Sequence, residues 1–350
     1  MESIAFYAGN LVIYWSSIVI VLGVLAGFCL SYSLYTAHSG RGSTMFVAFA
    51  FSLVLGILIS RILHFYSHQE QYDGFFRTVT DYSGGSYFLP GAVIGIWVGA
   101  MIVKSLGFAD SPYAVLDAMA PGMALSFAFV RLSALFTTSC RGKISVTTHS
   151  LQRLPLASAV ITASGKTEYR FATFFVTFML LIVSVFILLI FYIRHHRDKM
   201  KRGCSREGHV FRMFIVLYGV IELIMDSTRN DSTFPYFSIF KTLNRFGSFV
   251  SLTQLFAGIS ILIVFIWYSR RAVSPDGPRV KHWVLWILFA VGFAGVGVSE
   301  YLVQRHGDMF RRYYATMSAA DLILGLSVVL MYVFCRRPRV KKDSFSPERP

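Results

Sequence analysis

The sequence predicts an all-α polytopic membrane protein with about nine transmembrane helices. Of its 350 residues, 55% are hydrophobic and only 15% are charged. The mean hydropathy of +0.58 is too high for a soluble globular domain of this size. Apolar runs long enough to cross a bilayer, which takes roughly 20 helical residues, recur along most of the chain.

These runs divide the chain into nine expected membrane segments. They cover residues 12–35, 44–66, 87–106, 113–136, 171–194, 210–228, 248–269, 283–303 and 314–335. The fourth and sixth are the weakest hydropathy signals because they contain charged residues. A charged group buried among neighbouring helices is nevertheless compatible with a membrane-spanning segment.

The distribution of lysine and arginine predicts an N-terminus outside the membrane and a cytoplasmic C-terminus. With this orientation the majority of the 33 basic residues lie in cytoplasmic loops and in the tail. We therefore attribute the net charge of +15 to membrane topology and to contact with anionic lipid headgroups, and expect no nucleic-acid partner. The first segment lacks a preceding positive cluster and a cleavage site, which favours a retained helix over a signal peptide.

Cysteine and histidine spacing indicates neither a disulfide framework nor a metal site. Of the four cysteines, only Cys140 falls on the expected outer side, so it has no disulfide partner there. No zinc-type spacing is present, and His195-His196 lies in a basic loop where contact with lipid headgroups is the simpler interpretation. The sequence indicates no cofactor.

Three arginines are expected at a similar depth beneath the outer surface. Arg131 follows Asp117 by fourteen positions, which places it about 21 Å further along a helix. Arg61 falls late in the second segment and Arg229 closes the sixth. A buried guanidinium needs a carboxylate partner or a polar ligand, and its planar donor fork suits phosphate oxygens.

The sixth segment combines acidic and basic residues on one helical face. Glu222, Asp226 and Arg229 follow the spacing i, i+4 and i+7. Two interpretations stand: an ion-pair network that holds helices together, with Asp117 and Glu222 as helix-pairing residues, or a lipid-phosphate site with partial charge compensation. Excess positive charge from three arginines favours the phosphate site.

The third segment begins with a glycine-rich stretch, "DYSGGSYFLPGAVIG". Gly84, Gly85, Gly91 and Gly95 allow a close backbone approach, either to a lipid headgroup or to a neighbouring helix.

Taken in order, several motifs resemble the prolipoprotein diacylglyceryl transferases of bacterial plasma membranes. They are "LVLGILISRILHFY", "YSGG" with "GAVIG", "DAMAPG" followed by an arginine fourteen after its aspartate, Gly142-Lys143, "LYGVIELIMDSTRND" and "SLTQLFAGI". The resemblance covers roughly residues 10 to 271. It implies a seven-span lipid-transferase-like core at residues 1–271, followed by two additional helices at 272–335 and a basic cytoplasmic tail at 336–350.

The resemblance also implies an activity. Enzymes of this family transfer a diacylglyceryl group from phosphatidylglycerol to the lipobox cysteine of prolipoproteins, whose signal peptides are then partners. Arg61, Arg131 and Arg229 match the family's phosphate-binding arginines, and Gly142 matches a glycine that shapes the outer loop.

The chain departs from the family pattern at positions that matter for the chemistry. The family's histidine of the third segment falls on Pro90 or Leu89, and its asparagine after the fourth-segment arginine falls on Ala134. A family glutamate falls on Ser139, a tyrosine of the first segment on Ser16, and the sixth-segment arginine and glutamate fall on Glu222 and Asp226.

The proton acceptor of the family is therefore absent, and three residues are candidate substitutes. His64, three residues after Arg61, is a natural acid–base group near neutral pH, and Asp226 is the second candidate. Cys140 is a candidate nucleophile. Two functions are consistent with the sequence: a transferase with a degenerate set of family catalytic residues, or a non-catalytic phospholipid-binding or assembly protein on the same fold.

Overall fold

The computed structural model describes eleven ranges of the chain. They are residues 3–9, 11–38, 40–67, 74–76, 88–137, 140–161, 166–202, 207–229, 250–273, 280–305 and 309–336. Gly84, Gly85 and Ser139 lie outside the described residues, as does the predicted tail from residue 337 onward.

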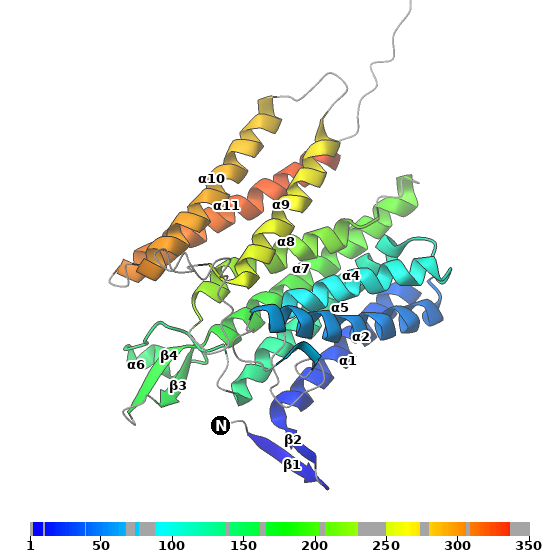
Figure 1. The fold of residues 1–350 in the computed structure, drawn as a ribbon. Coiled ribbons are helices and arrows are strands. Elements are labelled where there is room, and N and C mark those ends of the chain that lie inside the picture. Colours follow the sequence, from blue (N-terminus) through cyan, green and yellow to red (C-terminus); the bar gives the residue numbers. More distant parts are fainter. Residues whose placement is uncertain are drawn as a thin grey trace, which may run out of the picture.

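Each of the nine expected segments is a helix (Figure 1). The helices are α1 (Trp15–Thr36), α2 (Gly42–Ser67), α4 (Leu89–Ser105), α5 (Pro112–Ser133), α7 (Thr173–Arg202), α8 (His209–Ser227), α9 (Leu252–Ala272), α10 (Val280–Arg305) and α11 (Phe310–Arg336). The predicted all-α membrane architecture is thereby confirmed.

Hydropathy and length distinguish two of these helices from the others. Seven of the described helices, α1, α2, α5, α7, α9, α10 and α11, are long and apolar enough to cross a membrane. The fourth expected segment, α5, is among them despite its charges. Helix α4 is apolar but has only 17 residues, and α8 carries the buried carboxylates Glu222 and Asp226.

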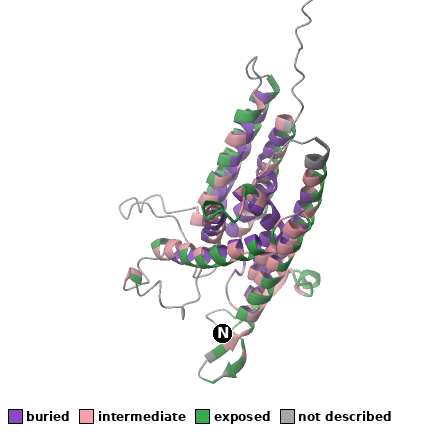
Figure 2. Cartoon of the chain, turned by 90° about the vertical axis from the view of Figure 1, so that its right-hand side faces the viewer, coloured by how far each residue is buried: buried purple, intermediate pink, exposed green. Residues whose placement is uncertain are grey.

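Buried and exposed residues alternate along most of the helices, which therefore turn one face to the interior (Figure 2), whereas α5 and α8 are buried or partly buried along almost their whole length. The outward faces carry large apolar side chains, among them Val54 (64% exposed), Ile287 (62%) and Leu322 (62%). Apolar surface of this extent suits contact with lipid.

Small residues bring two helix pairs into close contact. Helix α1 packs along α5, where a Cβ built at Gly122 would lie 2.2 Å from the carbonyl oxygen of Gly27. Helix α2 packs along α4, where a Cβ at Gly95 would lie 2.4 Å from the Cα of Gly56. Gly91 approaches the backbone of Ser60 in the same way. Gly91 and Gly95 therefore serve close helix packing, the simpler of the two predicted roles.

The last two helices pair with each other and cover one flank of the bundle. Helix α10 packs along α11, and α11 also contacts α9 and α8 (Figure 1). Gly292 lies against the backbone of Leu324, and Gly295 faces Ala320, whereas Gly297 has open space around it.

Two β-hairpins, absent from the predicted elements, lie among the connecting segments. Strands β1 (Ile4–Ala8) and β2 (Leu11–Tyr14) pair before α1, and β3 (Ala157–Ile161) pairs with β4 (Thr167–Phe171) before α7. The short helix η2 (Ala134–Phe136) directly precedes residues 137–170, and the short helix α6 (His149–Gln152) lies within them. This stretch, expected to be an outer loop, therefore has regular structure.

Candidate active site

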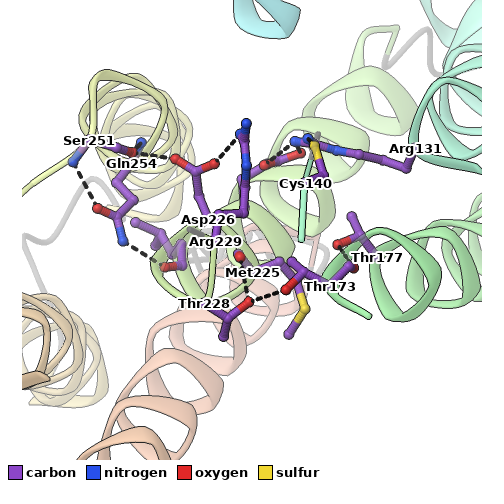
Figure 3. Close-up of polar contacts among 12 residues, drawn as sticks. Arg131, Cys140, Thr173, Thr177, Met225, Asp226, Thr228, Arg229, Ser251 and Gln254 are labelled. Atoms are coloured by element: carbon purple, nitrogen blue, oxygen red, sulfur yellow. Dashed lines mark hydrogen bonds and ion pairs between the residues drawn. The ribbon is translucent and has the colours of Figure 1, made fainter. Parts of the chain in front are cut away.

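Arg131 forms an ion pair with Glu222 between α5 and α8 (Figure 3). Its Nη2 donates to both carboxylate oxygens, at 2.5 Å and 2.6 Å, and its Nη1 donates to Cys140 Sγ at 3.4 Å. The two charged side chains are only 10% and 1% exposed. Arg131 Nε is buried without an acceptor among the described residues.

A second buried ion pair lies at the end of α8. Arg229 Nη1 donates to Asp226 Oδ1 at 2.7 Å, and Ser251 Oγ donates to Asp226 Oδ2 at 2.5 Å. The helix ends at Ser227, so Arg229 does not continue the helical face as expected. Its side chain turns back toward Asp226 from an isolated β-bridge with Gly142.

The N-terminus of α9 fixes the partner of Asp226. Ser251 and Gln254 form a capping box, in which each side chain accepts a hydrogen bond from the other residue's backbone N–H at 3.0 Å. Gln254 Nε2 also donates to the carbonyl oxygen of Leu223 at 3.0 Å. Helices α8 and α9 are thus held together at the level of the Asp226–Arg229 pair.

Gly142 lets three chain segments meet beside this pair. The backbone N–H of Gly142 donates to the carbonyl oxygen of Phe171 at 2.9 Å. The backbone N–H of Lys143 donates to the carbonyl oxygen of Thr228 at 2.8 Å. A Cβ at position 142 would lie 2.5 Å from the oxygen of Phe171. Only glycine fits without moving the backbone. The hydroxyls of Thr173 and Thr228, 2.8 Å apart, add a contact from α7 (Figure 3).

Lys143 extends the site toward the last two helices. Its ammonium donates to Gln304 Oε1 at 3.1 Å, and Gln304 Nε2 donates to Glu300 Oε1 at 2.7 Å. Burial lowers the pKa of Lys143, while the carboxylates of Glu300 and Asp226 oppose this shift. Neither Gln304 nor Glu300 was a predicted site residue.

Arg61 and His64 lie one turn apart on α2, and both are buried, with exposed fractions of 2% and 5%. The neighbouring Ser60 donates from Oγ to the carbonyl oxygen of Phe88 at 2.6 Å. The ring of Phe88 in turn packs against that of Phe256 in α9, with centroids 5.7 Å apart. This part of α2 is therefore connected through the start of α4 to α9.

Asp117 lies far from this site, near the other end of α5. Its carboxylate accepts hydrogen bonds from the backbone N–H groups of Gly208 and Phe211, at 2.6 Å and 2.9 Å. These N–H groups belong to the first turn of α8, where an anion is favourable. Asp117 thus joins α5 to the N-terminus of α8.

The ion pairs bear on the predicted charge balance. We predicted a phosphate site with partial compensation of three arginines, and two of them, Arg131 and Arg229, each contact a carboxylate directly. The physical reason is the high free-energy cost of burying an isolated charge. Glu222, at the position that aligns with a family arginine, supplies the carboxylate for Arg131.

Two aligned family positions offer no replacement chemistry. Pro90, Leu89 and Ala134 are apolar, and Ala134 is buried. Among the described residues, no cluster of histidine, cysteine, aspartate and glutamate has the arrangement of a metal site. Cys140, expected to face outward, is only 9% exposed and contacts Arg131.

Comparison with known proteins gives a family match over most of the chain. The sequence profile described as prolipoprotein diacylglyceryl transferase matches residues 3–264. Helices α1 to α9 fall almost entirely within this match, whereas α10 and α11 lie beyond it. The protein is thus a multi-pass membrane protein whose family match ends before α10.

Curated relatives agree with the profile. A phosphatidylglycerol–prolipoprotein diacylglyceryl transferase of Tropheryma whipplei is 26% identical over 230 residues, covering 64% of this chain and 80% of the relative. A protein of the same name from Finegoldia magna is 23% identical over 281 residues, covering 79% of this chain and 99% of the relative. The chain belongs to the prolipoprotein diacylglyceryl transferase family.

Proposed function

We propose that the protein is a transferase that moves the diacylglyceryl group of phosphatidylglycerol to the cysteine thiol of a lipoprotein precursor, with release of glycerol phosphate. The observation that carries the proposal is the convergence of Arg131, Gly142 and Arg229 at one end of the helical bundle. These three residues come from separate segments of a chain whose family match spans residues 3–264.

The reaction displaces a phosphate ester by a thiol. The sulfur forms a bond to the glycerol carbon that carries the phosphate, the carbon–oxygen bond breaks, and the leaving oxygen keeps the electron pair. Negative charge therefore grows on the phosphate in the transition state, and fixed cationic donors there lower the barrier. Arg131 and Arg229 are cations held in place by their ion pairs, and Arg131 Nε–H is buried without an acceptor among the described residues.

We assign the thiol proton to His64 in preference to Asp226. Both carboxylate oxygens of Asp226 already accept hydrogen bonds, from Arg229 and Ser251, so they are occupied within the protein. His64 lies one turn from Arg61 on α2, and histidine is the side chain most often used as a general base.

The proposed setting is the bacterial plasma membrane, with the N-terminus outside and the C-terminus in the cytoplasm. The site would then lie toward the outer leaflet, where the signal peptides of lipoprotein precursors emerge. The proposed partners are phosphatidylglycerol or a similar anionic phospholipid and these signal peptides, and no nucleic acid is required.

The test is release of glycerol phosphate by purified protein in nanodiscs that contain phosphatidylglycerol labelled in its headgroup. A lipobox peptide should stimulate release, and the same peptide with serine in place of the cysteine should not. We expect His64→Gln to lower the turnover rate by about 100-fold or more, a typical contribution of general base catalysis.

Two outcomes would contradict the proposal at different levels. Tight binding of phosphatidylglycerol without any peptide-dependent release would identify a non-catalytic lipid-binding protein. Unchanged release by His64→Gln would remove His64 from the mechanism but leave the transferase activity standing. The control is Lys166→Gln, at an exposed residue directly before β4, which should leave the release of glycerol phosphate unchanged.

A further inference from the structure

We propose that the chain binds an anionic phospholipid at the end of the bundle opposite the candidate active site, with the lipid phosphate held by the guanidinium groups of Arg212 and Arg271 beside Trp267. Arg212 precedes Asp226 by fourteen positions in α8, which is about 21 Å along the helix. This is a second lipid site, and it requires no transferase activity. In the proposed orientation it faces the cytoplasmic leaflet.

The indole of Trp267 has two positive charges at close range. The guanidinium carbon Cζ of Arg212 lies 3.5 Å from the centroid of the Trp267 ring, and that of Arg271 lies 3.9 Å from it. The two charges are therefore no further apart than the sum of these distances, 7.4 Å. The ring attracts each cation through its quadrupole without cancelling its charge, so the two like charges stay together. A phosphate that contacts both arginines relieves their repulsion.

The described residues neutralise this pair of arginines only in part. Among them, neither Arg212 nor Arg271 forms an ion pair. Asp117 is the carboxylate whose charge acts on Arg212, and both of its oxygens already accept hydrogen bonds from backbone N–H groups at the start of α8. Arg271 lies on the exposed last turn of α9, beside a further exposed arginine, Arg270. The pair therefore carries more positive than negative charge.

Arg212 lies where its own helix does not favour a cation. It belongs to the first turn of α8, which begins at His209, and the helix dipole is positive at that end. At the last turn of α9 the dipole is negative, so it accounts for Arg270 and Arg271 but not for Arg212. A ligand of negative charge gives Arg212 a function at this position.

Contacts from three helices fix the position of these side chains. The Arg212 Cζ also lies 5.4 Å from the ring centroid of Tyr113 in α5, and Arg212 Nη1 donates to the carbonyl oxygen of Glu207 at 3.4 Å. The ring of Trp267 packs against that of His209 with centroids 5.6 Å apart, which joins α9 to the start of α8. The guanidinium of Arg212 is thus held between the ends of α5 and α9.

An apolar stripe on α9 leads to the two arginines. Ile259 and Ile263 are 46% and 61% exposed, and Trp267 follows them at the same spacing of four residues, which places all three on one helical face. Helix α9 is long and apolar enough to cross a membrane, so an exposed apolar stripe on it suits contact with lipid. A phospholipid can lay an acyl chain along the isoleucines while its phosphate reaches the arginines. This continuity favours a lipid over a soluble phosphate.

The experiment measures lipid binding to the full-length protein in detergent by native mass spectrometry. Phosphatidylglycerol is the anionic lipid, and phosphatidylcholine is the zwitterionic one. We expect a preference for phosphatidylglycerol that falls about fivefold in Arg271→Gln and in Arg212→Gln, the effect of one basic residue near an anionic lipid surface. Arg271→Lys, which keeps the charge, should retain most of the preference.

Hydrogen exchange locates the bound lipid. Phosphatidylglycerol should slow exchange at the start of α8 and at the end of α9 in the unmodified protein, whereas phosphatidylcholine and inorganic phosphate should not. Arg194→Gln is the matched control, because Arg194 is an exposed arginine of α7 next to His195, whose ring lies 5.7 Å from that of His209 at the start of α8. We expect its lipid preference to equal that of the unmodified protein.

Three results would overturn the inference. The first is an unchanged preference for phosphatidylglycerol in Arg271→Gln, an exposed position that can be replaced without disturbing the core. The second is an equal loss in Arg194→Gln, which would indicate a general effect of surface charge. The third is slower exchange at the same segments with inorganic phosphate, which would identify a soluble anion as the ligand. Thermal unfolding without lipid checks that Arg212→Gln is folded, and Arg271→Gln decides the test if it is not.

Discussion

Neutralising Glu222 alone should destabilise the protein strongly. In Glu222→Gln the guanidinium of Arg131 keeps its charge but loses the carboxylate that now accepts at 2.5 Å and 2.6 Å. Both side chains are almost completely buried, at 10% and 1% exposure, so water cannot replace the partner. Breaking a buried pair in this way costs about 3–5 kcal/mol in the free energy of unfolding.

Removing both charges should have a much smaller effect on stability. Replacing a buried ion pair by apolar residues of similar size is often neutral or stabilising. We therefore expect the double variant Arg131→Met/Glu222→Leu to recover the unmodified stability to within about 1 kcal/mol. The same variant should lose transferase activity, because the proposed phosphate donor is gone.

Chemical unfolding in detergent, followed by tryptophan fluorescence, measures these free energies. The exposed pair of Arg170 and Glu168, 3.4 Å apart with side chains 24% and 50% exposed, supplies the control. Glu168→Gln should change stability by less than about 1 kcal/mol. Our reasoning would be refuted if Glu222→Gln were as stable as the unmodified protein, or if the double variant were less stable than either single one.

Two further predictions concern other parts of the molecule. Asp117→Ala should lower the free energy of unfolding by about 2 kcal/mol because the first turn of α8 loses two hydrogen bonds. Hydrogen exchange should localise the effect to that turn, and unchanged exchange at Gly208 and Phe211 would contradict the prediction. Gly142→Ala should reduce stability by about 1–3 kcal/mol through the clash with the oxygen of Phe171, whereas Gly297→Ala, with open space in α10, should be neutral or slightly stabilising.

The sequence alone was sufficient for the membrane architecture. Spanning a bilayer requires about 20 consecutive apolar residues, so the length and composition of each run already locate the helices. The two β-hairpins escaped this reasoning because their strands are only four or five residues long and follow no bilayer constraint. Motif order was likewise sufficient for the family, because the matching positions lie close together within each segment.

The charge partners of the site required the tertiary structure. Spacing placed Glu222, Asp226 and Arg229 near one another, yet it could not show that Glu222 pairs with Arg131, 91 positions away in the chain. It also gave no sign that Gln304 contacts Lys143 across 161 positions. Periodicity records which face of a helix is buried, whereas the partner of a buried charge depends on which helix packs against that face. The choice of partner is therefore a property of the folded bundle.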